Sequence, residues 1–214
     1  MPVSRLFLAS RNAGKLAEME RILAPLAPGI EVVGLEAVAS YDEPAEDRPT
    51  FEGNALLKAR AGLAATGLPT VADDSGLCVD ALNGMPGVLS ARWSGPALGG
   101  KMGDKRGADA RNNELLLAQL ADVPDERRGA HFVCVVAFCH PDGTEVVVRG
   151  EMRGRVTHAA RGSGGFGYDV VFEAADRPGV TTAELSVEDK DAISHRGKAL
   201  REAGPLIAAQ LRGD

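Results

Sequence analysis

The sequence is poor in several residue types, and each scarcity excludes a class of protein. Only three of the 214 residues are cysteines, and they lack the paired spacing of a disulfide scaffold or a zinc site. Because Cys78, Cys134 and Cys139 lie in apolar runs, we expect them to be reduced core thiols. No hydrophobic run is long enough to span a membrane, and the N-terminal LFLA segment is too short for a signal peptide. The sequence therefore predicts a cytoplasmic protein.

Positive charge is also scarce. The chain carries 24 Lys and Arg against 30 Asp and Glu, for a formal net charge of -6. Proteins that bind nucleic acids or membrane surfaces non-specifically usually have an excess of basic residues, so we expect neither partner. A polyanionic ligand would need a local cluster of positive groups.

What the sequence does contain is typical of a globular α/β enzyme. Hydrophobic residues make up 44% and charged residues 25% of the chain, whose length suits one large domain or two closely joined lobes. Apolar runs, helical spacing of leucines and turn residues give the element order. The predicted strands are 5–10, 30–35, 70–74, 130–139, 144–152 and 170–172, and the predicted helices are 16–26, 51–66, 109–120 and 195–211. A hairpin turn is predicted at 141–143, loops at 39–49 and 162–169, and a mobile excursion at 89–107.

Four polar, glycine-bearing segments interrupt this apolar framework. They are SRNAGK (10–15), DDSG (73–76), GSGGFGYD (162–169) and SHRG (194–197). In open α/β sheets, ligands bind at the loops beyond the strand ends, so these segments are candidates for one cleft.

The SRNAGK segment follows a predicted strand and opens a predicted helix. Backbone N–H groups at a helix start together with Lys15 suit the binding of a phosphate. The segment is not a Walker motif, because Leu16 stands where Ser or Thr would follow the lysine. Ser10 or Asn12 acting as an ordinary helix cap explains the same residues equally well.

The DDSG segment places two like charges, Asp73 and Asp74, at the apparent end of a buried strand. Mg²⁺ would compensate the charge, since it prefers oxygen ligands and is commonly held by one or two carboxylates together with substrate phosphates. Adjacent strand residues point to opposite faces, however, so the two need not share one site, and one could simply cap a turn. Both interpretations stay open at this stage.

The two later segments offer groups that suit a nucleotide. Phe166 and Tyr168 could stack on a base while Asp169 accepts a base N–H, although rings in a glycine-rich turn can equally pack into the core. His195 and Arg196 fall in the first turn of a predicted helix, where cations oppose the helix dipole and favour an anionic partner. A solvated basic face is the alternative.

Taken in order, these segments resemble one family. The set LASRNAGK, TFEGNALLKA, ADDSGLCVDALNGMPGVLSARWSG, GSGGFGYD, TAELS and ISHRGKAL is similar to the Ham1-like inosine triphosphate pyrophosphatase family over nearly the whole chain. The resemblance implies a single nucleotide pyrophosphatase domain, 1–214, with an elongated mixed β-sheet flanked by helices and two lobes around a central nucleotide cleft. It also implies a homodimer that uses Mg²⁺ to hydrolyse the non-canonical purine nucleotides ITP, dITP and XTP to the monophosphate and pyrophosphate, which cleanses the nucleotide pool.

The resemblance also assigns roles to individual residues. Asp74 matches the catalytic proton acceptor and a metal ligand, and Glu46 matches a second metal ligand. Because the loop around Glu46 is one residue shorter than a common form, Asp47 is an alternative ligand. The substrate-binding positions implied are Ser10, Arg11, Asn12, Ala13, Gly14, Lys15, Ser75, Phe166, Gly167, Tyr168, Asp169, Lys190, His195 and Arg196.

Three positions depart from the family pattern. Gly53 stands where the family often has Glu, and Glu52 could replace the missing carboxylate. Val170 replaces a usual Pro, which affects loop stiffness more than chemistry. Asp191 places a negative charge beside Lys190.

Two other functions remain as alternatives. A Maf-like nucleotide pyrophosphatase would act on modified pyrimidine or canonical nucleotides, but SHRG together with GGFGYD favours a purine substrate. A non-catalytic nucleotide-binding protein would bind without releasing pyrophosphate, and the intact Asp73, Asp74 and Lys15 count against it.

Overall fold

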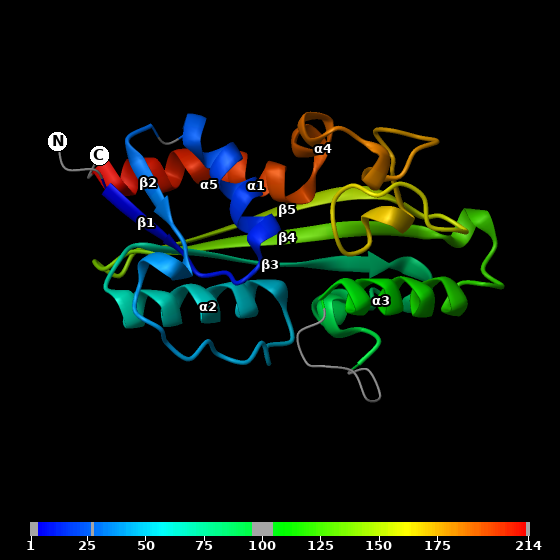
Figure 1. Cartoon of the computed structure of the whole chain (residues 1–214), viewed down its shortest axis with the longest axis horizontal. Coiled ribbons are helices and arrows are strands. Elements are labelled where there is room, and N and C mark those ends of the chain that lie inside the picture. Colours follow the sequence, from blue (N-terminus) through cyan, green and yellow to red (C-terminus); the bar gives the residue numbers. More distant parts are fainter. Residues whose placement is uncertain (1–3, 27, 96–104, 213–214) are drawn as a thin grey trace. The chain divides into compact units, whose positions relative to one another are not determined.

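The computed structural model describes residues 4–26, 28–95 and 105–212, which form a mixed six-stranded sheet flanked by helices (Figure 1). The strands are β1 Ser4–Leu8, β2 Ile30–Val33, β3 Thr70–Val79, β4 Gly129–Cys139, β5 Glu145–Val156 and β6 Phe172–Ala174. The helices are α1 Ala13–Leu26, α2 Phe51–Thr66, α3 Lys105–Gln119, α4 Val187–Ile193 and α5 His195–Arg212. The strand order is β2-β1-β3-β4-β5-β6. β1 pairs in parallel with β2 and β3, whereas β5 and β6 are antiparallel, so the predicted mixed α/β sheet is confirmed.

The chain divides into two compact units. Unit 1 consists of Met1–Asp74, Cys134–Gly150 and Ser194–Asp214, and unit 2 consists of Ser75–Val133 and Glu151–Ile193. Strands β3, β4 and β5 each contribute residues to both units.

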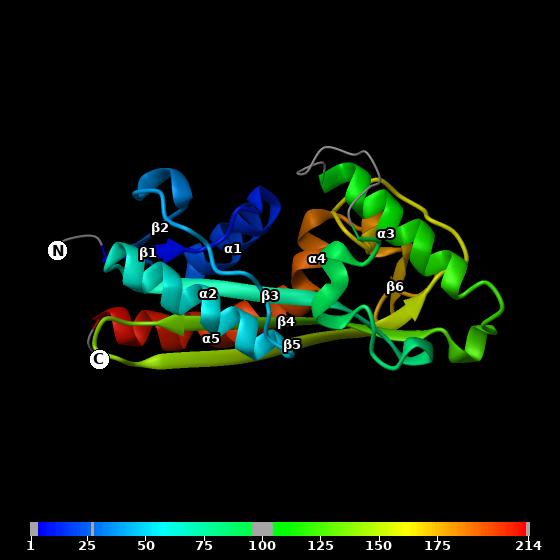
Figure 2. The ribbon, with the colours of Figure 1, turned by 90° about the horizontal axis from the view of Figure 1, so that it is seen from below.

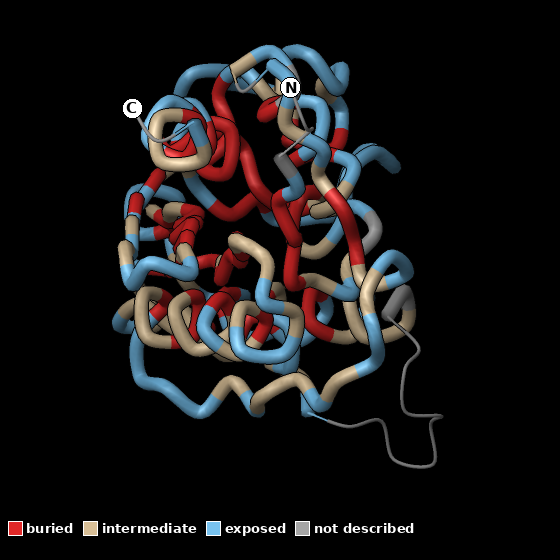
Figure 3. The backbone as a smooth tube through the Cα atoms, turned by 90° about the vertical axis from the view of Figure 1, so that its left-hand side faces the viewer, coloured by how far each residue is buried: buried red, intermediate tan, exposed pale blue. Residues whose placement is uncertain are grey.

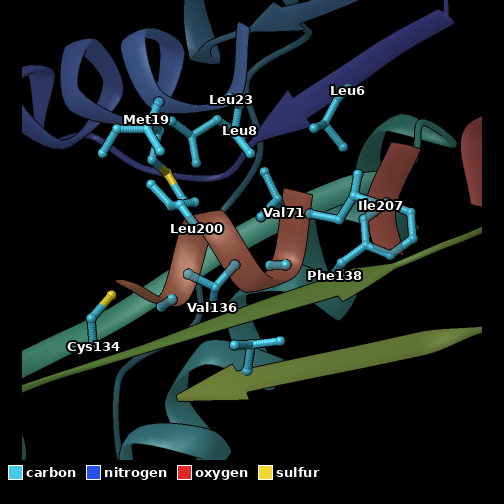
Figure 4. Close-up of a cluster of buried hydrophobic side chains, with 14 residues drawn as sticks. Leu6, Leu8, Met19, Leu23, Val71, Cys134, Val136, Phe138, Leu200 and Ile207 are labelled. Carbon is cyan, nitrogen blue, oxygen red and sulfur yellow. The ribbon is translucent and has the colours of Figure 1, made fainter. Parts of the chain in front are cut away.

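Unit 1 has helices on both faces of its strands. Helices α1 and α5 lie side by side on one face, and α2 covers the other (Figures 1 and 2). Between α1, α5 and the strands lies a core of buried side chains (Figure 4): Leu6, Leu8, Met19, Leu23, Val71, Cys134, Val136, Phe138, Leu200 and Ile207. On the other face, α2 approaches closely because Gly62 has no side chain, since a Cβ there would stand 2.8 Å from Thr70 Cγ2 and 3.0 Å from Phe7 Cε1.

Local sequence fixes both ends of α2. The Thr50 hydroxyl accepts a hydrogen bond from the Gly53 N–H at 3.1 Å, which caps the first turn. Gly67 ends the helix in the left-handed conformation at φ 68°, where a glycine avoids Cβ strain. The boundaries therefore coincide with those predicted from the sequence.

Unit 2 has its own core, in which α3 packs against the strands. Leu116 of α3 and Leu120, directly after the helix, join Phe132, Met152 and Phe172 in one buried cluster. Beside it lies the buried guanidinium of Arg128, which donates to four backbone carbonyls, those of Leu120, Val123, Val156 and Thr157. In both units the buried residues follow the strands and the inward faces of the helices (Figure 3).

Most predicted elements are present, but the strand that begins at Thr70 does not end at Asp74. β3 continues to Val79, so both aspartates are mid-strand residues. The prediction was wrong because Ser75 and Gly76 look like turn residues, although the apolar Leu77, Cys78 and Val79 follow them. A charged residue is tolerated inside a strand where other elements supply its partners.

Smaller differences concern short segments. β2 ends at Val33, and the predicted strand at 170–172 lies instead at Phe172–Ala174. Helix α4 was not predicted. Residues 89–92 belong to the 3₁₀ helix Gly87–Arg92 rather than to an excursion, and 96–104 lie outside the described residues. All three cysteines are free and buried, as predicted, and no described helix has the length and apolarity needed to cross a membrane.

The core of unit 1 yields a stability prediction. Leu200 is fully buried, whereas Leu206, on the same helix, is 48% exposed. We expect Leu200→Ala to lower the free energy of unfolding by about 2–5 kcal/mol, because it removes buried methyl groups and leaves a cavity. Chemical denaturation measures the change, and Leu206→Ala is the matched control. Equal effects of the two substitutions would contradict the assigned core.

Candidate active site

The two adjacent aspartates of β3 face two different environments. Asp73 contacts side chains of α1 and α5, while Asp74 contacts side chains of α2. Alternation along the strand separates them, which is one of the interpretations that the sequence left open. Each carboxylate therefore has its own set of partners and its own chemistry.

Asp73 is the centre of a buried ionic network in unit 1. Its Oδ2 lies 2.9 Å from Lys15 Nζ and 3.3 Å from Arg196 Nη2. Arg196 Nη1 in turn donates to Glu18 Oε2, which places two cations against two carboxylates. Burial alone would raise the pKa of Asp73, but Lys15 and Arg196 lower it well below its usual range. Asp73 is therefore firmly ionised and supports the positions of the two cations.

Asp74 has the opposite electrostatic character. Its Oδ2 accepts a hydrogen bond from Asn54 Nδ2 at 3.1 Å, and its Oδ1 lies 3.5 Å from Lys58 Nζ. The same ammonium group lies 2.5 Å from Glu46 Oε1. Burial raises the pKa of Asp74 against the opposing effect of Lys58, and Glu46 raises it further. Asp74 is thus the more basic of the two neighbours, as a proton acceptor should be.

Lys58 is charged in this setting. Burial would lower the pKa of its ammonium group, but Asp73, Asp74 and Glu46 together raise it. The ammonium group therefore supplies a fixed positive charge that bridges Asp74 and Glu46.

Asn54 and Lys58 were not among the residues predicted to act in the site. The Arg48 N–H donates to Asn54 Oδ1 at 3.0 Å, which turns the amide NH₂ of Asn54 toward Asp74. The two residues are four positions apart and share one helix face. Two buried or half-buried polar residues at this spacing in an Ala- and Leu-rich helix are the signal that could have identified them.

The structure distinguishes the acidic candidates near Asp74. Glu46 contacts Lys58, whereas its neighbour Asp47 is exposed and lies 3.2 Å from Arg48. Glu52 forms an ion pair with Arg149 of β5 at 2.9 Å, and it lies two positions before Asn54, so it faces another side of α2. The replacement of a carboxylate at Gly53 by Glu52 is therefore not supported.

The donor set around Asp74 suits a hard divalent cation. Two carboxylates, Asp74 and Glu46, share one ammonium group, and the pKa of Asp74 is raised, so added positive charge would stabilise the pair. No group of three or more His, Cys, Asp or Glu suited to a metal occurs in the described part of the chain. Two carboxylates are what Mg²⁺ commonly takes from a protein when water and substrate phosphates complete its shell.

The start of α1 is capped by its own sequence. Asn12 Oδ1 accepts hydrogen bonds from the N–H groups of Gly14 and Lys15, at 3.0 and 3.3 Å, so the capping interpretation is confirmed. Ser10 Oγ accepts the N–H of Asn12. Lys15 extends from this turn to Asp73, which fixes the position of its ammonium group.

The remaining residues of this segment have simpler surroundings. Ala13 is the first residue of α1. Arg11 is largely exposed, and its Nε lies 2.9 Å from Glu43 Oε1.

The glycine-rich loop of unit 2 separates its two aromatic residues. Tyr168 is buried, and its hydroxyl donates to the Ser90 carbonyl at 2.9 Å, so this ring belongs to the core. Phe166 is 37% exposed, and Lys190 Nζ lies 5.1 Å from its ring centroid, which is a cation–π distance. The core alternative therefore holds for Tyr168 and not for Phe166.

Asp169 organises this loop from within. Its Oδ2 accepts hydrogen bonds from the Phe166 N–H and from Lys190 Nζ, and its Oδ1 accepts the Thr182 hydroxyl. Gly165, at φ 70°, passes so close that a Cβ there would overlap Asp169 Oδ2. Glycine is thus required at this position both for conformation and for space.

The start of α5 is buried rather than solvated. Ser194 Oγ caps the helix by accepting the Gly197 N–H at 2.9 Å, as predicted. His195 and Arg196 are 6% and 2% exposed, so the alternative of a solvated basic face is wrong. Ser75 follows Asp74 directly on β3 and is half-buried.

The fold and this cluster define an α/β protein in which two adjacent aspartates of one strand face lysines from two helices. The sequence model of the Ham1 family matches residues 6–205. The chain therefore belongs to the Ham1 family, and the resemblance drawn from its motifs is confirmed.

Individual relatives agree with this assignment. A dITP/XTP pyrophosphatase of Nocardia farcinica is 58% identical over 210 residues, which cover 98% of this chain and 97% of the relative. The crystal structure of a nucleoside-triphosphatase / dITP/XTP pyrophosphatase from Mycobacterium abscessus is 53% identical, covers 93% of this chain and 98% of its own, and superposes with a TM-score of 0.72. The Ham1 protein of Staphylococcus aureus is 35% identical, covers 97% of this chain and 100% of its own, and gives a TM-score of 0.81.

The ionic network predicts how stability depends on acid. Asp73 has a lowered pKa in the folded chain, so its stabilising contribution is fully present above its unfolded pKa of about 3.9 and is lost as pH falls below that value. We expect Asp73→Asn to leave two buried cations undercompensated and to lower the free energy of unfolding by about 3–5 kcal/mol at neutral pH.

The substitution should also flatten the loss of stability from about pH 4 downward, because the titrating group is gone. Denaturation at a series of pH values measures both effects. Asp122→Asn, at an exposed aspartate, is the control. An unchanged acid slope in Asp73→Asn would refute the role of this network.

Proposed function

We propose that this chain is a nucleoside triphosphate pyrophosphatase that hydrolyses non-canonical purine nucleotides, dITP, XTP and ITP, to the monophosphate and pyrophosphate. The relatives named dITP/XTP pyrophosphatase, aligned over nearly the whole chain, support the substrate class. The observation that carries the chemistry is Asp74, a buried carboxylate of raised pKa held beside an ammonium group and a second carboxylate. The family resemblance also supports a cytoplasmic homodimer that cleanses the nucleotide pool.

The metal in this proposal is Mg²⁺, with Asp74 and Glu46 as its protein ligands. When bound, the ion supplies charge neutralisation at the phosphate oxygens. The carboxylate pair bridged by Lys58 supports this assignment, because its geometry already accommodates one cationic group.

Asp74 acts as the proton acceptor in the proposed reaction. A water oxygen forms a bond to the α-phosphorus, the bond from that phosphorus to the bridging oxygen breaks, and pyrophosphate leaves with the bond electrons. The water proton passes to Asp74, whose raised pKa suits this role. Asn54 orients the carboxylate, and Lys58 stabilises negative charge that develops beside it.

Residues 10–15 bind the phosphate chain in this proposal. Lys15 supplies a positive charge at the start of α1, where the helix dipole also favours an anion. Because Asp73 holds the ammonium group in place, little side-chain freedom is lost when a phosphate binds. Asn12 already accepts two amide N–H groups of this turn, so the lysine rather than those amides is the main phosphate contact.

Residues 166–169 and Lys190 bind the base. The exposed ring of Phe166 offers a stacking surface. Discrimination comes from donors aimed at the 6-oxo group, since adenine presents an amino group there and would leave those donors unpaired. Arg196 is engaged by Asp73 and Glu18, which favours a backbone N–H as this donor. His195 and Ser75 complete the proposed substrate contacts.

A nucleotide panel tests the function directly. We expect pyrophosphate release from dITP, XTP and ITP with Mg²⁺, little release from ATP, GTP or dTTP, and none with chelator. Asp74→Asn should abolish turnover while the chain stays folded, because the amide cannot accept the proton at working pH. Preferred release from dTTP or ATP would favour the Maf-like alternative, and tight dITP binding without turnover would favour a non-catalytic binder.

A pair of neighbouring carboxylates tests the metal assignment. We expect Glu46→Gln to raise the Mg²⁺ concentration for half-maximal rate by about tenfold or more, because it removes one anionic ligand. Asp47→Asn is the matched control, since Asp47 is exposed and paired with Arg48, and it should leave the titration unchanged. The reverse pattern would assign the ligand to Asp47.

A further inference from the structure

One turn of α3 contacts both peptide groups of a single residue in the glycine-rich loop. Asp109 Oδ2 accepts the Gly167 N–H at 2.9 Å, and Asn113 Nδ2 donates to the Gly167 carbonyl at 2.9 Å. Asp109 and Asn113 are four residues apart, so they project from the same face of the helix. Together they bind the two polar groups of Gly167 from the same side.

The orientation of Asn113 is fixed by its own helix. Its Nδ2 also donates to the Asp109 carbonyl at 2.9 Å, and the residue is buried. The amide therefore presents its NH₂ group, and not its oxygen, to the loop. The carboxylate of Asp109 can only accept and the NH₂ group of Asn113 can only donate. The pair therefore fits the N–H and the carbonyl of one loop residue in a single alignment, with Gly167 opposite both side chains.

The neighbouring loop residues are anchored in different ways. Asp169 accepts the Phe166 N–H, and the Tyr168 hydroxyl donates to the Ser90 carbonyl. Gly167, at φ 63°, lies between them in a conformation that favours glycine. Each of these hydrogen bonds involves a backbone atom, and none involves the Phe166 ring, which is exposed.

We infer that Asp109 and Asn113 are positioning residues for the Phe166 ring. By binding both peptide groups of Gly167, they set the direction in which the preceding residue projects and keep its ring beside Lys190. In this inference neither residue contacts the base; both act through Gly167. Their role in catalysis rests on the proposed function, because it requires that Phe166 stacks on the base.

Steady-state kinetics with dITP test this role. We expect Asp109→Ala and Asn113→Ala each to raise KM by about tenfold with little change in kcat, since one well-formed hydrogen bond of the loop is lost while the carboxylate site of unit 1 is untouched. Asn113→Asp should be worse than Asn113→Ala, because a carboxylate would face the Gly167 carbonyl. Glu114→Ala, at an exposed position of the same helix, is the control.

A second readout needs no substrate. The chain has one tryptophan, Trp93, so Trp93→Phe with Phe166→Trp gives a single fluorophore at the loop. Adding Asp109→Ala, which removes the acceptor for the Gly167 N–H, or Asn113→Ala, which removes the donor to its carbonyl, should lower the fluorescence anisotropy of the new tryptophan. Circular dichroism and thermal melting establish that each variant is folded, and Asn113→Ala serves where Asp109→Ala does not fold.

The outcomes separate this inference from the proposed function. Raised KM and lowered anisotropy support the positioning role. Unchanged anisotropy in folded variants overturns it, as does a fall in kcat without a change in KM or an equal effect of Glu114→Ala. If the unsubstituted chain does not hydrolyse dITP, the proposed function fails, and the anisotropy still decides whether Asp109 and Asn113 position the loop.

Discussion

The interaction on which unit 1 depends is the buried contact of Asp73 with Lys15 and Arg196. A carboxylate in the middle of a buried strand is costly unless charged partners surround it. α1 and α5 supply those partners, so the two helices must pack on the same face of β3 for the strand to keep its aspartate. The Glu18 carboxylate balances the second cation. One charged residue in the sheet thereby links the positions of two helices that are remote in the sequence.

Much of this fold is predictable from local pattern, and the parts that are not share one cause. The ends of α2 follow from Thr50 and Gly67, which act within a few residues of themselves. The true length of β3 does not, because the residues that make Asp73 tolerable lie elsewhere; Arg196 is 123 positions further along the chain. A rule based on local sequence places the end of the strand at the two adjacent charges. In the folded chain Lys15 and Arg196 compensate the charge of Asp73, and the strand continues to Val79.

The same dependence on distant residues limits what the sequence predicts about the candidate site. The alternation of a strand places Asp73 and Asp74 on opposite faces, and the resemblance selects Asp74. Neither shows that Asn54 turns its amide toward Asp74, because that orientation depends on a backbone N–H of Arg48. In unit 2, the sequence of the glycine-rich loop does not show its anchors, which are Asp109, Asn113 and Asp169. Anchors of this kind are side chain to backbone contacts, which leave no periodic signal.

The choice of cation on each face of β3 completes the physical account. Besides the ammonium group of Lys15, Asp73 contacts the guanidinium of Arg196, whose planar fork binds a carboxylate in a fixed geometry and suits a permanent structural pair. Asp74 contacts the ammonium group of Lys58, a compact charge that neutralises without imposing that geometry. An arginine beside Asp74 would occupy its lone pairs, while a lysine shared with Glu46 leaves room for further ligands. In the proposed function these two adjacent aspartates therefore differ in role: Asp73 is fixed by a guanidinium and an ammonium group, whereas Asp74 shares one ammonium group with Glu46 and keeps room for chemistry.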